Sequence, residues 1–256
     1  MISLILGDCL EKMKEIASGS IDLTVTSPPY DNLRTYNGSL EWGEHVWKPI
    51  LSELFRVTKK GGVVVWVVGD ATIKGSETGT SFKQALWAME CGFRLHDTMI
   101  YQKHNFSNPS NNRYHQIFEY MFIFSKGKPK TFNPIKDRKN IEAGNIGCRG
   151  KNTNRQPNGS FATRVKKIVA EFGMRYNVWR LQTEMKPLHP AQFPEKLAND
   201  HIVSWSNEGD TIFDPLMGSG TTGKMVNLNN RNFIGIEKVE EYYITAVKRI
   251  SEARKV

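Results

Sequence analysis

The strongest constraint on the fold of this chain is the alternation of short apolar runs with amphipathic stretches. The apolar runs, such as 21–25, 63–68 and 233–236, are about four to eight residues long, which is the length of buried strands. The stretches between them have the apolar spacing of helices. We therefore predict an α/β fold with a mostly parallel sheet and helices on both of its faces.

The same spacing predicts the individual elements. Strands are expected at 2–6, 21–25, 63–68, 95–101, 117–124, 211–213 and 233–236, and helices at 9–16, 46–57, 81–90, 194–204, from 221 and from 239. The helix at 46–57 is expected to end in the turn Lys59-Lys60-Gly61-Gly62, because basic residues followed by glycine are typical of helix ends. In the Gly- and Asn-rich region after Lys126, residues 165–172 are expected to form a short helix.

Length and charge indicate one domain that carries a basic insertion. A chain of 256 residues fits a single sizeable domain, 1–256, and the loss of regular alternation marks approximately 128–185 as inserted. Between Lys126 and Lys186 there are fifteen Lys and Arg and four acids, a net charge of +11, so the rest of the +9 chain carries −2. Such a segment predicts contact with a polyanion, with an ordinary solvated surface loop as the alternative.

Composition excludes several classes of protein. No apolar run approaches the roughly 18 residues of a membrane span, and 1–6 is followed at once by Gly7-Asp8, unlike a signal peptide. A cytoplasmic protein with no membrane partner is therefore expected. The cysteines, Cys9, Cys91 and Cys148, lie far apart, so neither disulfides nor a bound metal is expected.

The segment Phe213 to Thr222, which joins a strand to a helix, has the composition of a ligand-binding loop. Gly218 and Gly220 let the backbone approach a ligand closely, and the following helix offers free N–H groups. The segment lacks the Lys-Ser/Thr ending of a phosphate-binding loop and the full dinucleotide motif. Glu237, at the end of the next strand, is suited to accept hydrogen bonds from two ribose hydroxyls. Together these features predict a site for a cofactor that contains a nucleoside.

A second loop, Thr26-Ser27-Pro28-Pro29-Tyr30, follows the strand at 21–25. Consecutive prolines fix the backbone and hold the neighbouring carbonyl groups rigid as acceptors, and an aromatic ring beside them can stack on a planar ring. A rigid turn that ends a strand is the plain alternative. The whole string directly after a buried strand is much more specific for a binding or catalytic loop.

These two loops resemble the motifs of amino-group DNA methyltransferases, which methylate the N4 of cytosine or the N6 of adenine. Ser27-Pro28-Pro29-Tyr30 resembles their catalytic motif, and Phe213 to Gly220 resembles their cofactor motif. The resemblance covers most of the chain outside 128–185. The order of catalytic loop, basic region and cofactor loop resembles the circularly permuted β class. The resemblance implies a Rossmann-like methyltransferase fold, S-adenosylmethionine as cofactor, and double-stranded DNA as substrate.

Residues of this sequence are assigned to three roles. The resemblance implies that the catalytic residues are Ser27, Pro28, Pro29 and Tyr30. It implies that the cofactor-binding residues are Asp8, His189, Pro190, Gln192, Phe213, Asp214, Pro215, Met217, Gly218, Ser219, Gly220, Thr221, Thr222 and Glu237. Charge and position in loops give the expected DNA-binding residues, which are Arg34, Arg113, Lys128, Lys130, Arg138, Lys139, Arg164, Lys166 and Lys167.

The residue types suggest how an exocyclic amine is methylated. This amine is a poor nucleophile because its lone pair is delocalised into the ring. If the Ser27 hydroxyl and the Pro28 carbonyl accept its two hydrogens and Tyr30 stacks on the base, the lone pair turns toward the methyl group. The target nitrogen is paired within a duplex, so the base has to be flipped out. No cysteine nucleophile is required.

Several alternatives stay open from the sequence. Serine at the first position of the catalytic motif slightly favours cytosine N4 over adenine N6. An RNA or nucleoside amino-methyltransferase and an inactive domain that only binds nucleic acid are the alternative functions. The sequence leaves open the recognition sequence, a cognate restriction endonuclease as in restriction-modification systems, and a homodimer.

Overall fold

The computed structural model describes residues 1–30, 42–106, 109, 111–146, 153–163, 168–182 and 193–253. They form two compact units. The larger unit comprises Met1–Asn133 and Asn177–Val256, and the smaller one comprises Pro134–Tyr176. Within the described ranges, no helix is long and apolar enough to cross a membrane.

The larger unit is built on a sheet to which eight strands of the described residues belong. In spatial order they are β1 (Ile2–Leu6), β14 (Asn232–Glu237), β13 (Thr211–Asp214), β2 (Ile21–Thr26), β3 (Thr58–Val68), β7 (Phe118–Ser125), β6 (Arg94–Gln102) and β12 (Val178–Arg180). From β1 to β3 all neighbours are parallel, whereas β7 is antiparallel to both β3 and β6. The predicted, mostly parallel sheet is confirmed, with β7 running against it.

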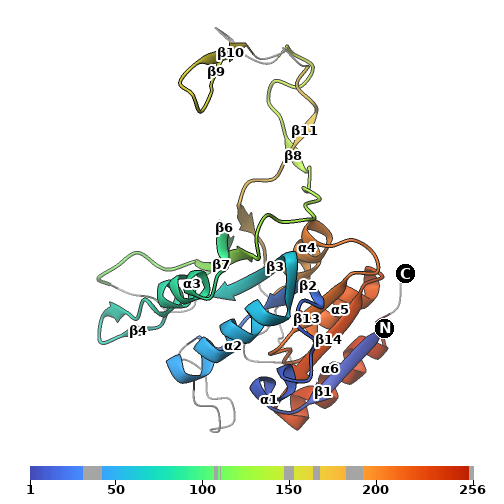
Figure 1. Ribbon diagram of the computed structural model, residues 1–256. Coiled ribbons are helices and arrows are strands. Elements are labelled where there is room, and N and C mark those ends of the chain that lie inside the picture. The colour runs from blue at the N-terminus through green and yellow to red at the C-terminus, as the bar shows by residue number, and fades with distance from the viewer. Residues whose placement is uncertain are drawn as a thin grey trace. The chain divides into compact units, whose positions relative to one another are not determined.

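Helices cover both faces of this sheet, as predicted (Figure 1). One face carries α4 (Glu195–Trp205), α5 (Thr221–Leu228) and α6 (Glu240–Ser251), and the other carries α1 (Cys9–Met13), α2 (Glu44–Val57) and α3 (Thr80–Glu90). Successive side chains of β3 point to opposite faces of the sheet, so they contribute to two separate cores. Val63 and Val65 belong to the α4–α6 core, and Val64 and Trp66 belong to the α1–α3 core.

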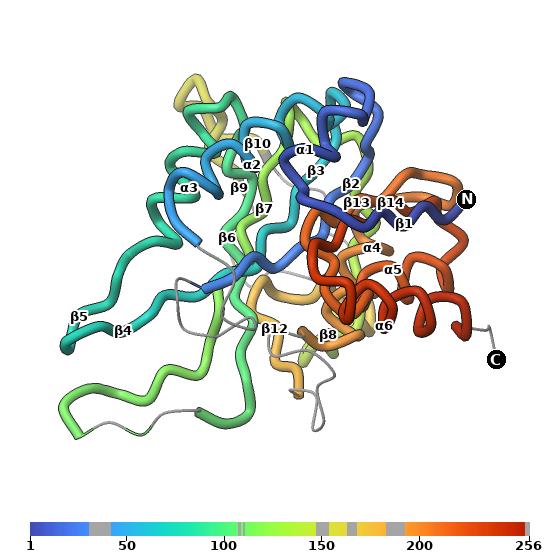
Figure 2. The backbone as a smooth tube through the Cα atoms, turned by 90° about the horizontal axis from the view of Figure 1, so that it is seen from below, coloured from blue at the N-terminus to red at the C-terminus, as the bar shows by residue number. Residues whose placement is uncertain are grey.

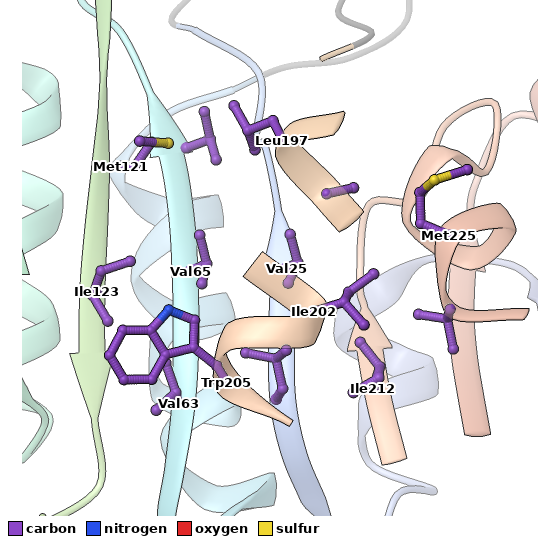
Figure 3. Packing of buried hydrophobic residues seen from close by; sticks show 14 of the residues in the cluster. Val25, Val63, Val65, Met121, Ile123, Leu197, Ile202, Trp205, Ile212 and Met225 are labelled. Atoms are coloured by element: carbon purple, nitrogen blue, oxygen red, sulfur yellow. The ribbon is translucent and has the colours of Figure 1, made fainter. Parts of the chain in front are cut away.

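The core under α4 packs on β2 and β13, the strands that precede the two predicted loops. Figure 3 shows Leu197 and Ile202 of α4 packed over Val25 of β2 and Ile212 of β13. All four side chains are fully buried, and each such burial contributes about 1.5–3 kcal/mol. This packing fixes β2 and β13, the two strands that end in the predicted loops.

One predicted turn is instead part of a strand. β3 begins at Thr58, directly after α2, and its pairing with β2 shifts register between Ile21 and Leu23. The residues Lys59 to Gly62 therefore form an irregular stretch at the start of β3. Backbone bonds from Gly61 N to Lys126 O at 2.7 Å and from Lys126 N to Gly62 O at 3.1 Å hold this stretch against the end of β7. The helix ends at Val57, and the residues predicted as its terminal turn are paired with the end of β7.

The smaller unit consists of short antiparallel pairings. β8 (Arg138–Lys139) pairs with β11 (Phe172–Gly173), and β9 (Thr153–Arg155) pairs with β10 (Phe161–Thr163). The prediction of a helix at 165–172 is wrong for the described residues 168–172. Ile168 bridges to Ile146, and Glu171 O accepts from Asn140 N at 2.9 Å, so the backbone pairs with another segment. β-branched residues such as Ile168 favour this extended form.

A small hairpin follows β3 and was not predicted. β4 (Thr72–Ile73) and β5 (Ser76–Glu77) are joined by Lys74 and Gly75, which both have positive φ, at 49° and 82°. Two such residues in succession match the twist that a tight hairpin turn requires. The hairpin and the region around Arg113 are connected, because Arg113 donates to Gly75 O.

Candidate active site

Both predicted loops lie at one edge of the larger unit's sheet, where the parallel strands end. Ser27 follows β2, and Pro215 follows the neighbouring strand β13. On the other side of β13, Glu237 ends β14, and Gly7 N donates to Glu237 O at 2.8 Å from the end of β1. Figure 2 shows β1, β14, β13 and β2 side by side. Parallel pairing thus brings together residues from both ends of the chain.

A direct hydrogen bond joins the two loops. Thr26 Oγ1 donates to Asp214 Oδ1 at 2.7 Å, and both side chains are buried. The same Asp214 oxygen accepts from Leu216 N at 3.1 Å, at the start of the cofactor loop. From the other side, Thr222 Oγ1 donates to Val25 O at 3.1 Å. The predicted catalytic loop is therefore held at a fixed place beside the glycine-rich loop.

The predicted catalytic loop, 26–30, is fixed through Tyr30. Tyr30 OH lies 3.1 Å from Ser27 Oγ and donates to Glu119 Oε2 at 2.7 Å. Glu119, at the start of β7, has its other oxygen 2.5 Å from Lys103 Nζ, which follows β6. Because β7 is antiparallel, its first residues lie at the edge where β2 and β3 end. A Cβ placed on Gly69 would lie 3.6 Å from the Tyr30 ring, so this ring packs against the end of β3.

The glycine-rich loop turns sharply into α5. Gly220 has φ 80° and precedes the helix, and a Cβ there would approach Ala246 Cβ to 2.9 Å, so close packing on α6 also requires glycine. The side chains of Phe213 and Met217, two of the residues predicted to bind the cofactor, are buried in the two cores. They pack beneath the loop and support its backbone.

Arg249 of α6 braces the glycine-rich loop and was not predicted. Its guanidinium donates to Ser219 O at 2.7 Å and to Ser219 Oγ at 2.9 Å. It also contacts Glu195 Oε1 at 3.0 Å, and the same oxygen accepts from Lys224 Nζ at 2.7 Å. The charged group thus ties the loop to the first turn of α4 and to α5.

Two acids lie side by side at the ends of β14 and β1. Glu237 Oε2 accepts from Gly218 N at 2.9 Å, and Glu237 Oε1 accepts from Val239 N at 2.8 Å. Burial raises the pKa of the Glu237 carboxyl, while these N–H groups act in the opposite direction. Asp8 caps α1 through Leu10 N and has its other oxygen 3.1 Å from Lys238 Nζ. Carboxylate oxygens beside a glycine turn fit the hydroxyl and amino hydrogens of a nucleoside.

The sequence profile of the DNA methylase family, which includes enzymes of the N6 and N4 type, matches residues 21–248. The chain belongs to the DNA methylase family. This confirms the resemblance predicted from the sequence, and with it a DNA methyltransferase of the N6/N4 amino type. Methyltransferases of this family take the methyl group from S-adenosylmethionine, as predicted.

Known proteins agree with this assignment over nearly the whole chain. The orphan methyltransferase M.BamHII of Bacillus amyloliquefaciens is 56% identical to this DNA methylase over 249 residues, which are 93% of this chain and 92% of the relative. The solved structure of the PvuII DNA methyltransferase (cytosine-N4-specific) has a TM-score of 0.70 at 20% identity and covers 97% of this chain and 86% of its own. The M1.HpyAVI–SAM complex has a TM-score of 0.64 at 24% identity, with 98% and 100% covered. The two structures support the fold.

The predicted DNA-binding residues of this DNA methylase lie in different places. Arg113 is held by the β4–β5 hairpin, with Glu77 Oε1 at 3.9 Å from its guanidinium. Arg138 and Lys139 belong to the smaller unit. Outside the described residues lie Arg34, Arg164, Lys166 and Lys167, and the cofactor-site residues His189, Pro190 and Gln192.

Lys128 and Lys130 lie at the wrong edge of the sheet for contact with a base beside Ser27. Lys130 N donates to Gly61 O at 2.9 Å, near the start of β3. The catalytic loop lies at the other end of β2 and β3. The charge of this segment predicts a basic region, but it does not indicate the edge of the sheet at which Lys128 and Lys130 lie.

The cysteines of the described part are not placed for catalysis. Burial, and then the nearby Asp8 carboxylate, raises the pKa of the Cys9 thiol to about 12, so it stays protonated at neutral pH. Cys91 is the C-cap residue of α3, and its Sγ lies 3.4 Å from Ser52 Oγ of α2. Within the described ranges no three His, Cys, Asp or Glu side chains come together as a metal site.

Asp214 is expected to make stability depend on pH. Burial raises the pKa of its carboxyl from 3.8 to about 7, against the lowering effect of the bonds from Thr26, Thr222 and Leu216. Since the folded pKa lies above the unfolded one, the folded chain keeps a proton that the unfolded chain releases. The free energy of unfolding should therefore fall, by up to ~4 kcal/mol, as pH rises through this window, and level off above it.

The substitution Asp214→Asn should remove this dependence, because the amide keeps an oxygen for Thr26 and Leu216 but does not ionise. Urea unfolding in about one-unit steps from about pH 4 to pH 8 measures the difference between the two proteins. The exposed Glu208→Gln is the matched control. A difference between wild type and Asp214→Asn that is constant with pH would mean that Asp214 is ionised throughout.

Proposed function

We propose that this DNA methylase transfers a methyl group from S-adenosylmethionine to the exocyclic amino nitrogen of a base flipped out of duplex DNA. The observation that carries the proposal is the Thr26–Asp214 hydrogen bond of 2.7 Å, which holds the catalytic loop against the cofactor loop. A reaction between two bound molecules needs such a fixed juxtaposition of their sites.

The proposed cofactor site consists of the acids and the glycine turn. Glu237 would accept hydrogen bonds from the ribose and Asp8 would meet the adenine, while the backbone from Gly218 to Thr222 approaches the rest of the molecule. The sulfonium of the bound cofactor supplies an activated methyl group. Arg249 keeps the turn in place through Ser219.

The proposed base site consists of Ser27, Pro28 and Tyr30. The Ser27 hydroxyl and the Pro28 carbonyl accept the two N–H groups, and the Tyr30 ring stacks on the base. Positive charge develops on the nitrogen as the new N–C bond forms, so these two acceptors bind the transition state more strongly than the ground state. The proton then leaves through the hydroxyl or to water.

We propose cytosine N4 as the target, with adenine N6 as the alternative. Serine at position 27 supports cytosine, and the similar solved structure of the PvuII enzyme is named cytosine-N4-specific. The family profile covers both reactions. Expression of the chain in cells free of DNA methylation, followed by digestion of the DNA to nucleosides and mass spectrometry, identifies the base. N4-methylcytosine is expected. N6-methyladenine would overturn the choice of base, and unmodified DNA would overturn the proposed reaction.

The basic insertion is proposed to recognise the DNA sequence. In the smaller unit of the chain, the Arg138 guanidinium lies over the Tyr176 ring at 4.6 Å from its centroid, and Lys139 is exposed. Such groups suit phosphate and base contacts. A DNA substrate also supports the proposal of a cytoplasmic enzyme. The name of the first relative, an orphan methyltransferase, supports an enzyme that works without a cognate endonuclease.

Neutralising Arg138 and Lys139 with Arg138→Gln/Lys139→Gln is expected to weaken DNA binding and to flatten its salt dependence. Each lost phosphate contact reduces the slope of log K against log salt by about 0.9, so the pair should reduce it by about 2. Fluorescence anisotropy at several salt concentrations measures the slope. The matched pair Lys128→Gln/Lys130→Gln, at the far edge of the sheet, should change it less. Equal slopes in all three proteins would reassign the insertion to a plain surface role.

A further inference from the structure

The bonds around Tyr30 have a defined direction. An ionised carboxylate carries no hydrogen and only accepts, so in the 2.7 Å bond between Tyr30 OH and Glu119 Oε2 the phenol donates. Lys103 Nζ, 2.5 Å from Glu119 Oε1, supplies a cationic donor to the other oxygen. Glu119 is 7% exposed, so these two donors satisfy a carboxylate that is nearly shielded from water.

This direction determines what Ser27 can do. Tyr30 has one hydroxyl hydrogen, and that hydrogen is committed to Glu119. In the 3.1 Å contact between Ser27 Oγ and Tyr30 OH, the serine must therefore donate and the phenol oxygen must accept. The lone pairs of Ser27 Oγ are then left for hydrogens that come from elsewhere. The loop presents an acceptor, although a serine hydroxyl alone can also donate.

We propose that Glu119 is a positioning residue that acts through Tyr30 to make the Ser27 hydroxyl an acceptor toward the target amine. The proposal rests on the proposed function, in which Ser27 receives an N–H of that amine. It explains how a serine hydroxyl, which can both donate and accept, acts only as an acceptor at this position. It also gives a role to the antiparallel direction of β7, which brings Glu119 to this edge.

Glu119→Gln tests the direction without removing volume. Lys103 has donors only, so it selects the amide oxygen of the new side chain and turns the NH₂ group toward Tyr30. The phenol must then accept from this NH₂ and donate to Ser27, which points the serine hydrogen at the amine. A buried hydrogen bond with donor and acceptor reversed destabilises the state that contains it. Here that state is the transition state, so the rate of methyl transfer falls by about 10- to 100-fold. We expect kcat to fall by that factor while the KM for DNA changes less than about threefold.

Asp22→Asn is the matched control. Asp22 is also a lysine-paired acid in the larger unit, 2.6 Å from Lys59 Nζ, but it lies at the amino end of β2, away from Ser27. Its kcat should stay within about twofold of wild type. Thermal unfolding and calorimetric binding of S-adenosylhomocysteine by every variant show whether the fold and the cofactor site are intact.

A second substitution should restore part of the activity. In Lys103→Met/Glu119→Gln no cation selects the amide oxygen, so the amide can turn this oxygen toward Tyr30 and re-establish the original direction. The double variant should have a kcat at least about threefold higher than Glu119→Gln. If Glu119→Gln caused only a general packing defect, the kcat of the double variant would instead be lower than that of Glu119→Gln. In a Ser27→Ala background, Glu119→Gln should lower kcat by no more than about twofold, because there is no hydroxyl left to orient.

The outcomes separate this inference from the proposed function. A Glu119→Gln enzyme with wild-type kcat, or losses from Ser27→Ala and Glu119→Gln that simply multiply in the double variant, would overturn the role of Glu119 alone. If Ser27→Ala itself leaves kcat unchanged, the proposed base site is wrong and the inference fails with it. A loss confined to the KM for DNA would make Glu119 a binding residue and would also overturn the inference.

Discussion

Replacing Ser27 with alanine is expected to lower kcat by about 10²- to 10³-fold, because it removes an acceptor for a hydrogen on a nitrogen that becomes positively charged. The affinity for DNA should change less than about threefold, since the ground-state amine can bond to water. Single-turnover transfer of a labelled methyl group measures the chemical step, and DNA affinity is measured separately. The two readings distinguish a lost transition-state contact from lost binding.

Ser20→Ala is the control for this substitution. Ser20 precedes the same strand, β2, at its other end, is partly exposed, and donates to Ala17 O at 2.7 Å. It should methylate DNA at the wild-type rate. A Ser27→Ala enzyme that retains its kcat would contradict the proposed base site, in which Ser27 accepts a hydrogen of the target amine.

Replacing Glu237 with glutamine is expected to raise the Kd for S-adenosylhomocysteine by about 10- to 100-fold. The Glu237 oxygens accept from Gly218 N and Val239 N, at 2.9 Å and 2.8 Å. An amide offers one oxygen, so its NH₂ group would face one of these N–H groups. The glycine turn should shift, and an acceptor for the ribose is lost at the same time. Titration calorimetry of the folded protein measures the change without any turnover.

Glu240→Gln is a matched control for this second substitution, because Glu240 is an exposed acid in the first turn of α6. Its affinity should equal that of wild type within about twofold. If Glu237→Gln keeps wild-type affinity, Glu237 serves only to brace the Gly218 turn, and the ribose contacts have to come from other residues.

Much of this site could be predicted because its residues are contiguous in sequence. The strings at 26–30 and 213–222 each follow a buried strand, and the parallel order of the sheet then brings them to one edge. The helices and strands that carry them have clear periods of 3.6 and two. Their bounds in the structure differ by only a few residues from those expected, as for α2 at Glu44–Val57.

The residues that were missed depend on geometry that periodicity does not encode. Glu119 lies in an apolar strand whose pattern is the same in either direction, and only the antiparallel pairing of β7 brings it to Tyr30. Arg249 is a basic residue in the last turn of a helix, where the helix dipole alone would explain it. Its bonds to Ser219 become visible only when α6 is packed against the loop.

The charge composition likewise predicts how many basic residues the segment carries, but not where in the fold these residues lie. The +11 segment divides between the two units, because Lys128 and Lys130 belong to the larger unit and Arg138 and Lys139 belong to the smaller one. A count of lysines cannot separate these, because the division follows from the backbone pairing of Lys130 with Gly61.

The pairing of β1 with β14 has a consequence for how the protein is made. The first strand of the chain finds its neighbour more than 200 residues later, since Ile2 pairs with Phe233. β2 likewise pairs with a strand that is synthesised much later, β13, since Thr24 pairs with Phe213. A nascent chain on the ribosome therefore carries unpaired strand edges until the last strands emerge, the condition in which chaperones are most needed. Asp214 and Glu237 lie at the ends of β13 and β14, so a chain that stops before these strands lacks the residues that hold the two loops together.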